Sequence, residues 1–253
     1  MKTKKVRVIA VSNQKGGVAK TTSAINVATL LPDCLVVDLD PQGNLTTGLG
    51  VEVAKGQPTT YEVLTERIQV QNALVSTKSG VTLLPADITL AQGEPEILSK
   101  VGNYYLIKEA LAPVMKDFQY VLIDCPPSLG LLTVNGLTAA NLVLIPVQCQ
   151  FFALKGLAAL QETIRSVQKR INPELKILGV LPTMAEINTL MTQDVIASLE
   201  KRFTDTKVFK PVPKSVKFAE SNVAGEPIHL YVTEPKLTEP YQEVAKFIIE
   251  GGM

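Results

Sequence analysis

Short runs of consecutive apolar residues, separated by segments long enough for a helix, constrain the fold of this chain most strongly. The apolar runs occupy Val6–Ser12, Cys34–Asp38, Val81–Pro85, Tyr120–Cys125, Leu142–Val147 and Lys176–Leu181. Strands that are apolar on successive residues are buried on both faces, which is typical of parallel sheets covered by helices. Helical patterns lie between the runs, near 20–31, 60–68, 104–116, 130–140, 154–170, 190–203 and 239–250.

This alternation predicts right-handed βαβ units and one continuous sheet. No stretch rich in Ser, Gly or Pro divides the 253 residues, and the sequence has no internal repeat. We therefore expect one α/β domain over residues 1–253, with a mostly parallel twisted sheet flanked by helices on both faces. In such a sheet, ligands bind at the carboxyl ends of the strands, so functional residues should follow the apolar runs.

The histidine and cysteine contents exclude several kinds of site. The chain has one histidine, His229, and three cysteines, Cys34, Cys125 and Cys149. A metal site built from histidines is therefore not available, and the cysteines are too widely spaced for a zinc or iron–sulfur site. We expect buried, reduced thiols, a structural histidine and a soluble cytoplasmic protein, because no apolar run approaches the roughly 18 residues that span a bilayer.

A glycine-containing turn follows the first apolar run. Residues 13–22 read Asn-Gln-Lys-Gly-Gly-Val-Ala-Lys-Thr-Thr, and a helical pattern comes next. This is the context of a phosphate loop, in which Lys20 would contact the β- and γ-phosphates and the Thr21 hydroxyl would bind Mg²⁺. Gln14 and Ala19 occupy the two glycine positions of the strict pattern. On the pattern alone, nucleotide binding and an ordinary glycine-containing turn are therefore equal alternatives.

Four segments in order resemble the ParA/MinD family of positioning ATPases, which carry a deviant Walker A phosphate loop. The phosphate loop matches, including a second lysine, Lys15. Val36–Asn44 resembles the family's switch I, and Val121–Ser128 its Walker B and switch II segments. Gly179–Met184 and Pro211–Lys214 resemble the strand and loop that hold adenine in ParA-type members. The resemblance implies a P-loop NTPase fold with ATP and Mg²⁺ as cofactors.

The resemblance also implies a role for individual residues. Lys20 would bind the β- and γ-phosphates, Asp40 would position the attacking water, and Lys15 would reach the ATP of a partner subunit. The residues that would contact the nucleotide are Gly16, Gly17, Val18, Ala19, Lys20, Thr21, Thr22, Thr183, Met184, Pro211, Val212 and Pro213. Those that would hold the metal are Thr21, Asp38 and Asp124. Phosphoryl transfer depends mostly on positioning and charge neutralisation, so it does not require histidine.

Two residues depart from the family pattern. Ala19 stands where the family usually has glycine, and its Cβ either tightens the loop or slows hydrolysis. Lys155 stands where many relatives have glutamate. It is either a second basic group near a dimer interface or a solvated lysine at the start of a helix, and the second interpretation is favoured.

A basic stretch near the carboxyl end contrasts with the net charge of the whole chain, which is +1. Residues 201–217 contain six basic side chains and one acidic side chain. The family binds DNA without sequence preference through late basic residues, and phosphate contacts need only Lys and Arg. The alternative is a solvated basic edge. The candidate DNA-binding residues are Lys201, Arg202, Lys207, Lys210, Lys214 and Lys217.

The resemblance as a whole implies a ParA-type ATPase that forms an ATP-sandwich homodimer and binds nucleoid DNA non-specifically. It would position a plasmid, a chromosome region or a carboxysome, and a ParB-like or cargo-adaptor protein would stimulate hydrolysis. A MinD-like membrane positioner is an alternative, but residues 241–253 carry two acids and one lysine, which favours a docked helix. A metabolic P-loop enzyme is another alternative, and Lys15 favours the dimeric switch over it.

Overall fold

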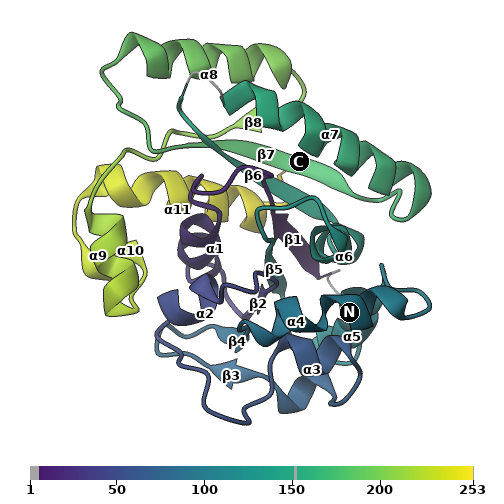
Figure 1. Ribbon diagram of the computed structural model, residues 1–253. Coiled ribbons are helices and arrows are strands. Elements are labelled where there is room, and N and C mark those ends of the chain that lie inside the picture. Colours follow the sequence, from purple (N-terminus) through teal and green to yellow (C-terminus); the bar gives the residue numbers. More distant parts are fainter. Residues whose placement is uncertain (1–5, 151–152, 253) are drawn as a thin grey trace.

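One eight-stranded sheet forms the centre of the protein in a computed structural model (Figure 1), which describes residues 6–150 and 153–252 but not the side chains of 153–155. The strands are β1 (Arg7–Val11), β2 (Cys34–Asp38), β3 (Val75–Ser76), β4 (Thr82–Leu84), β5 (Tyr120–Asp124), β6 (Leu142–Gln148), β7 (Lys176–Thr183) and β8 (Lys207–Val208). Their order across the sheet is β3-β4-β2-β5-β1-β6-β7-β8. Neighbouring strands are parallel except β3 and β4, which confirms a mostly parallel sheet.

Helices cover both faces of this sheet, as the alternating pattern predicts (Figure 1). One face carries α1 (Lys20–Ala28), α2 (Asn44–Gly48), α9 (Lys217–Ala224), α10 (Ile228–Tyr231) and α11 (Pro235–Ile249). The other face carries α3 (Thr60–Leu64), α4 (Thr89–Ser99), α5 (Leu106–Leu111), α6 (Leu131–Ala139), α7 (Ala153–Arg170) and α8 (Leu190–Arg202). Two 3₁₀ turns, η1 (Val70–Asn72) and η2 (Met115–Asp117), lie in the connections.

The central strands contribute side chains to two separate hydrophobic cores. In β1, Val8 and Ala10 face one core, whereas Ile9 and Val11 face the other. Successive residues of a strand point to opposite faces, so a strand between two helical layers must be apolar at every position. This explains why consecutive Val, Ile and Leu residues identified the central strands.

Several short elements differ from the prediction. The helical pattern over 60–68 forms a helix only to Leu64, because Glu66 adopts a left-handed conformation with φ of 61°. Helix α4 was not predicted, because Gly93 and Pro95 are typical of turns. At Gly93, a Cβ would collide with the ring of Tyr61, so this glycine lets α4 approach α3 closely. Helices α2, α9 and α10 and strands β3 and β8 were also not predicted.

The last helix, α11, packs on the sheet rather than standing free. Leu237, Tyr241, Val244 and Ile248 on this helix are buried in the same core as α1. It begins at Pro235, four residues before the predicted start, because proline fits the first turn of a helix. Within the described residues, no helix combines the length and apolar character needed to cross a bilayer. The three cysteines are free and buried, as expected.

Candidate functional site

A cavity of about 870 Å³ opens beside the turn that follows β1, at the carboxyl end of the sheet. Strand β1 lies between β5 and β6, and the chain continues from β1 to β2 on one side before crossing to β6 on the other. Such a reversal of strand order is where open α/β sheets bind ligands. The predicted nucleotide and metal residues in the cavity wall, together with the predicted catalytic Asp40, are Gly16, Gly17, Ala19, Lys20, Thr21, Thr22, Asp40 and Met184.

Hydrogen bonds to strands β6 and β7 fix the turn after β1. Asn13 Nδ2 donates to the carbonyl of Pro146 at 2.6 Å, and Asn13 Oδ1 accepts from the Lys15 N–H at 3.0 Å. Thr183 Oγ1 donates to the carbonyl of Val18 at 3.0 Å. Val18 and Thr183 are both buried and neither lines the cavity, so Thr183 holds the loop in place instead of facing the cavity.

Ala19 adopts a left-handed conformation at the N-cap of α1, with φ of 62° and ψ of 34°. This conformation is unfavourable for alanine by roughly 1–2 kcal/mol and costs glycine nothing. Alanine has no polar atom to cap the helix, so the first N–H groups of α1 are left for an anion. The structure thus shows that Ala19 keeps a glycine conformation at the price of backbone strain.

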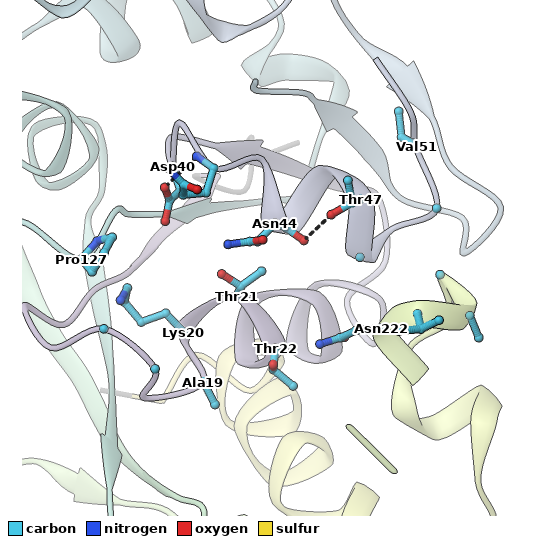
Figure 2. A pocket seen from close by; sticks show the side chains of 18 of the residues that line it. Ala19, Lys20, Thr21, Thr22, Asp40, Asn44, Thr47, Val51, Pro127 and Asn222 are labelled. Carbon is cyan, nitrogen blue, oxygen red and sulfur yellow. Dashed lines mark hydrogen bonds between the residues drawn. The ribbon is translucent and has the colours of Figure 1, made fainter. Parts of the chain in front are cut away.

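Lys20 is buried although it carries a charge. Its Nζ donates to the carbonyl of Lys15 at 3.3 Å, and the side chain is only 6% exposed. Burial lowers the pKa of Lys20, and the nearby carboxyls of Asp124 and Asp40 oppose this shift. Figure 2 shows that its amino group lies beside the cavity, on the same side as Asp40. An anion in the cavity would compensate the buried positive charge.

Two buried carboxyls lie side by side at the ends of β2 and β5. Asp38 and Asp124 are paired across these strands, and both are fully buried. Burial raises the pKa of Asp38 to about 7, and burial together with Asp38 raises the pKa of Asp124 well above its usual range. Thr21 Oγ1 donates to Asp124 Oδ2 at 2.7 Å, whereas Asp124 Oδ1 is buried without a partner among the described residues.

This arrangement fits a magnesium ion. The partnerless oxygen of Asp124, the Thr21 hydroxyl and two neighbouring carboxyls whose pKa is raised by burial form an environment in which a hard divalent cation would stabilise the ionised carboxylates. In the described part of the chain, no three His, Cys, Asp or Glu residues gather as a metal cluster. Mg²⁺ usually takes one or two carboxylates and completes its shell with phosphate oxygens and water, so two carboxyls suffice.

Asp38 also holds the segment after β2 in shape. Its two oxygens accept hydrogen bonds from the Thr46 N–H, the Thr46 hydroxyl and the Asp40 N–H at 2.7–3.0 Å. Asp40 lies in the cavity wall, and its Oδ1 accepts from the Gln42 N–H at 3.0 Å. Gly43 has φ of 62°, and a Cβ there would lie 2.7 Å from the carbonyl of Ala86. The segment that carries Asp40 is therefore rigid.

The structure separates the residues predicted to hold adenine. Met184 lines the cavity, with φ of 51°. Pro211, Val212 and Pro213 are absent from its wall; they lie against the end of β7, where the Val212 N–H donates to the carbonyl of Pro182 at 2.8 Å.

Sequence reasoning missed another part of the wall. It is lined by Gly48, Gly50, Val51, Glu52, Lys78, Asn222, Val223, Ala224 and Gly225. Figure 2 shows Asn222 of α9 facing Thr22 across the cavity, with Thr47 of α2 above. The α9 residues belong to a helix that the sequence pattern did not predict, so no local signal identified them.

Lys15 points away from the cavity. Its Nζ donates to Gln148 Oε1 at 3.1 Å and to Gln150 Oε1 at 3.4 Å, at and just beyond the end of β6. Strand β6 lies on one side of β1, whereas β5 and β2 lie on the other side. Asp38 and Asp124 end β2 and β5, and Asp40 follows β2. The two lysines of the phosphate loop thus have different positions, since Lys20 lies in the cavity wall and Lys15 does not. The side chain of Lys155 is outside the described residues.

The basic stretch is less positive on the folded surface than in the sequence. Four of its six cations form ion pairs with glutamates at 2.9–3.5 Å: Lys207 with Glu243, Lys210 with Glu239, Lys214 with Glu186 and Lys217 with Glu220. Arg202 donates two hydrogen bonds to Gln161 Oε1. Lys201 is exposed at the end of α8. The excess of positive charge in residues 201–217 is therefore largely balanced by acids from other segments.

A parallel sheet, a phosphate loop that leads into a helix, and buried carboxyls on neighbouring strands together define a P-loop nucleotide hydrolase. Residues 6–177 match the family described as AAA domain. The sporulation initiation inhibitor protein Soj of Bacillus subtilis is 42% identical over 252 residues, covering 97% of this chain and 99% of Soj. The chromosome partitioning protein ParA of Caulobacter vibrioides is 39% identical over 251 residues, covering 96% and 94%.

A solved structure supports the same fold and the nucleotide site. Cobyrinic acid a,c-diamide synthase from Mycobacterium smegmatis, with a bound ATP analogue and magnesium, superposes with a TM-score of 0.85 at 41% identity. The match covers 97% of this chain and 95% of that one. The chain described here belongs to the Soj/ParA family of chromosome-partitioning ATPases. The resemblance found in the four sequence segments is thereby confirmed.

Proposed function

We propose that this chain is a ParA-type molecular switch, which dimerises around ATP, binds DNA in that state and is released when ATP is hydrolysed. The observation that carries the proposal is the separation of the two loop lysines. Lys20 lies in the wall of the cavity, whereas Lys15 points outward from the same loop. A lysine outside its own site is suited to act on the nucleotide of a second subunit.

The nucleotide would occupy the cavity with its phosphates over the turn after β1. Lys20 would contact the β- and γ-phosphates, and the N–H groups at the start of α1 would face the same anion. Thr21, Asp124 and Asp38 would hold Mg²⁺ directly or through water, and the bound ion would neutralise charge on the phosphates. The Thr21–Asp124 hydrogen bond of 2.7 Å already places these two oxygens together.

Hydrolysis would depend on positioning more than on acid–base chemistry. Asp40 would orient the attacking water, and its carboxylate is fixed by the Gln42 N–H. Lys15 of each subunit would stabilise the charge of the phosphoryl group bound by the other, as an arginine finger does in related reactions. Met184 in the cavity wall is the favoured contact for the adenine ring of ATP, and the loop Pro211–Pro213 lies adjacent to Met184.

DNA would be bound through the basic stretch in the dimer. Exposed ion pairs are weak, with a net contribution of roughly 0–1 kcal/mol, so DNA phosphates can compete with Glu186 for Lys214 and with Glu220 for Lys217. Pairing two chains doubles the number of contacts and raises the effective concentration of the second site. ATP would therefore control DNA affinity even though one chain has little net charge.

The cellular role would follow from this cycle. The protein would act in the cytoplasm, on the nucleoid, and a ParB-like or cargo-adaptor protein would stimulate hydrolysis. Chromosome or plasmid partition is the favoured cargo function, because the relatives with high coverage are named Soj and ParA. Carboxysome positioning is the same mechanism applied to another cargo.

DNA retention with ATP, with ADP and without nucleotide, across a salt series, tests the proposal. Binding should require ATP and should weaken steeply as salt increases. The double variant Lys214→Glu, Lys217→Glu should lose retention but keep ATP-dependent dimerisation. Lys55→Glu, an exposed lysine outside the basic stretch, is the matched control and should bind like the wild type. Equal retention in all three nucleotide conditions would overturn the proposal.

A metabolic function is the second candidate, because one similar chain is named cobyrinic acid a,c-diamide synthase. An enzyme of that kind would need a small carboxylate substrate and would turn over ATP without DNA or a partner protein. Substrate-dependent ATP consumption by a monomer, with no retention on DNA, would favour it.

A membrane-positioning function of the MinD type is weaker. It needs a C-terminal amphipathic helix that is free to bind lipid, and the apolar face of α11 is buried in the core. Flotation with anionic vesicles in the presence of ATP would reverse this judgement.

A further inference from the structure

The outward-pointing lysine of the phosphate loop is held by two neutral side chains. Lys15 Nζ donates to Gln148 Oε1 at 3.1 Å and to Gln150 Oε1 at 3.4 Å. Among the ion pairs of the described residues, none involves Lys15. The side-chain hydrogen bonds of this partly buried ammonium to the described residues thus go to amide oxygens, and we call Gln148 and Gln150 the glutamine clasp.

The chemistry of the clasp favours reversible holding. An amide oxygen accepts a hydrogen bond from an ammonium but carries no net charge, so the contact is weaker than a pair with a carboxylate. Gln150 is exposed, and Gln148 is partly exposed. Water can therefore hydrogen-bond to both glutamine oxygens when the lysine leaves, so that neither is left buried without a partner.

The backbone of Lys15 is fixed independently of its side chain. Its N–H donates to Asn13 Oδ1 at 3.0 Å, and Asn13 is anchored to Pro146 on β6. Release of the ammonium thus requires only rotation about side-chain bonds, while the phosphate loop keeps its shape. A long flexible side chain on a rigid loop is suited to exchange one set of acceptors for another.

We propose that Gln148 and Gln150 are positioning residues that hold Lys15 on the β6 side of its own subunit and release it when a second copy presents a bound nucleotide. The inference rests on the proposed action of Lys15 on the partner's phosphates. In this exchange the ammonium leaves two neutral oxygens and gains negatively charged phosphate oxygens. Breaking the two hydrogen bonds to the glutamines costs free energy, which offsets part of the free energy gained at the partner's phosphates. The glutamine clasp therefore affects the net stability of the dimer.

Two substitutions at the clasp should have opposite effects. The double variant Gln148→Ala, Gln150→Ala removes the competing acceptors, so dimers with a non-hydrolysable ATP analogue should form about threefold to tenfold more tightly. Gln148→Glu converts the contact to an ion pair and should weaken dimerisation by about fivefold to tenfold, because a carboxylate adds a Coulomb attraction for the Lys15 ammonium that a neutral amide oxygen lacks. Gln71→Glu adds the same charge at an exposed position in η1 and is the control for charge alone.

The experiment measures the dimer dissociation constant of each variant by sedimentation velocity, with and without Lys15→Ala. If the clasp acts through Lys15, the glutamine substitutions should have no effect once Lys15 is alanine. A direct readout is the rate at which an amine-acylating reagent modifies Lys15 in the nucleotide-free monomer, followed by mass spectrometry. The rate should rise in the double alanine variant and fall in Gln148→Glu.

The outcomes separate this inference from the function on which it rests. If Lys15→Ala neither lowers ATP hydrolysis nor weakens the dimer, the proposed action of Lys15 on the partner is wrong. If Lys15→Ala does both but the glutamine variants match the wild type in dimerisation and in Lys15 acylation, only the clasp is refuted. The clasp would also be refuted if the glutamine substitutions changed dimerisation as much in the Lys15→Ala background as in the presence of Lys15. Such a result would indicate a general change at the end of β6.

Discussion

Replacement of Ala19 by glycine should stabilise the protein, although glycine substitutions usually have the opposite effect. Ala19 has φ of 62° and ψ of 34°, a conformation that is unfavourable for alanine by roughly 1–2 kcal/mol. Glycine adopts it freely but has more conformational freedom in the unfolded chain, which offsets roughly 0.4–1 kcal/mol of the gain. At the middle of both ranges, the free energy of unfolding should therefore rise by about 0.8 kcal/mol.

Thermal unfolding of the nucleotide-free protein can measure this gain. For a chain of this size, 1 kcal/mol shifts the Tm by about 2–4 °C, so Ala19→Gly should raise it by about 1–4 °C. Ala24→Gly in the middle of α1 is the matched control. Ala24 is helical and fully buried, so its replacement should lower stability by about 2 kcal/mol, through helix propensity and the lost methyl group. An unchanged or lower Tm for Ala19→Gly would refute the assignment of strain to this position.

The remaining predictions concern the site and the sheet. Lys20→Ala should abolish ATP binding in a calorimetric titration, because it removes the buried cation beside the cavity; binding of wild-type strength would contradict the assignment. Asp40→Ala should retain ATP binding but lose hydrolysis and accumulate dimers, and phosphate release at the wild-type rate would show that Asp40 does not position water. The pKa of Asp38 is raised to about 7, so the folded protein retains a proton that the unfolded chain loses near pH 4. Stability of the nucleotide-free protein should therefore fall as the pH rises from 4 through 7, by up to about 4 kcal/mol from Asp38, and Asp38→Asn should reduce this dependence in denaturant unfolding, while Asp124, whose pKa is also raised, keeps part of it. Gly179→Ala should lower the free energy of unfolding by about 1–3 kcal/mol, because its Cβ would collide with the Phe209 ring and lie 2.8 Å from the carbonyl oxygen of Lys207; unchanged urea unfolding would show that both the ring and the β8 backbone can move aside.

The sequence predicted the parts of the fold that carry a strong local signal. Central strands such as β5 are apolar on nearly every residue because both faces are covered, whereas a strand with one solvated face would alternate with polar residues. The start of α3 also carries a local signal, because Thr59 and Glu62 have the three-residue spacing of a capping box. In the structure Glu62 Oε2 accepts from the Thr59 N–H at 2.8 Å. Helix α4 was missed because Gly93 and Pro95 indicate a turn locally, whereas close packing against α3 decides the outcome.

In the candidate site too, residues in contiguous motifs were predictable from the sequence, whereas residues brought together by packing were not. Lys20, Thr21 and Asp40 were singled out from the sequence because a phosphate loop and a strand-end carboxylate are contiguous motifs, and all three line the cavity. Asn222 and the glutamines that hold Lys15 were not found, since their roles depend on which elements meet in space. The pairing of the basic residues in 201–217 could not be predicted for a similar reason. The glutamates that pair with these lysines come mostly from distant segments, such as Glu239 and Glu243 of α11.

The two edges of the sheet restrict how copies of this chain can associate. Both outer strands, β3 and β8, are only two residues long, and β3 runs antiparallel to its neighbour. An edge this short offers too few free N–H and C=O groups to template another strand. Association by extending the sheet, the common route to unregulated aggregates and fibres, is therefore disfavoured. Copies of the chain would then associate through side-chain surfaces, as in the proposed nucleotide-dependent dimer.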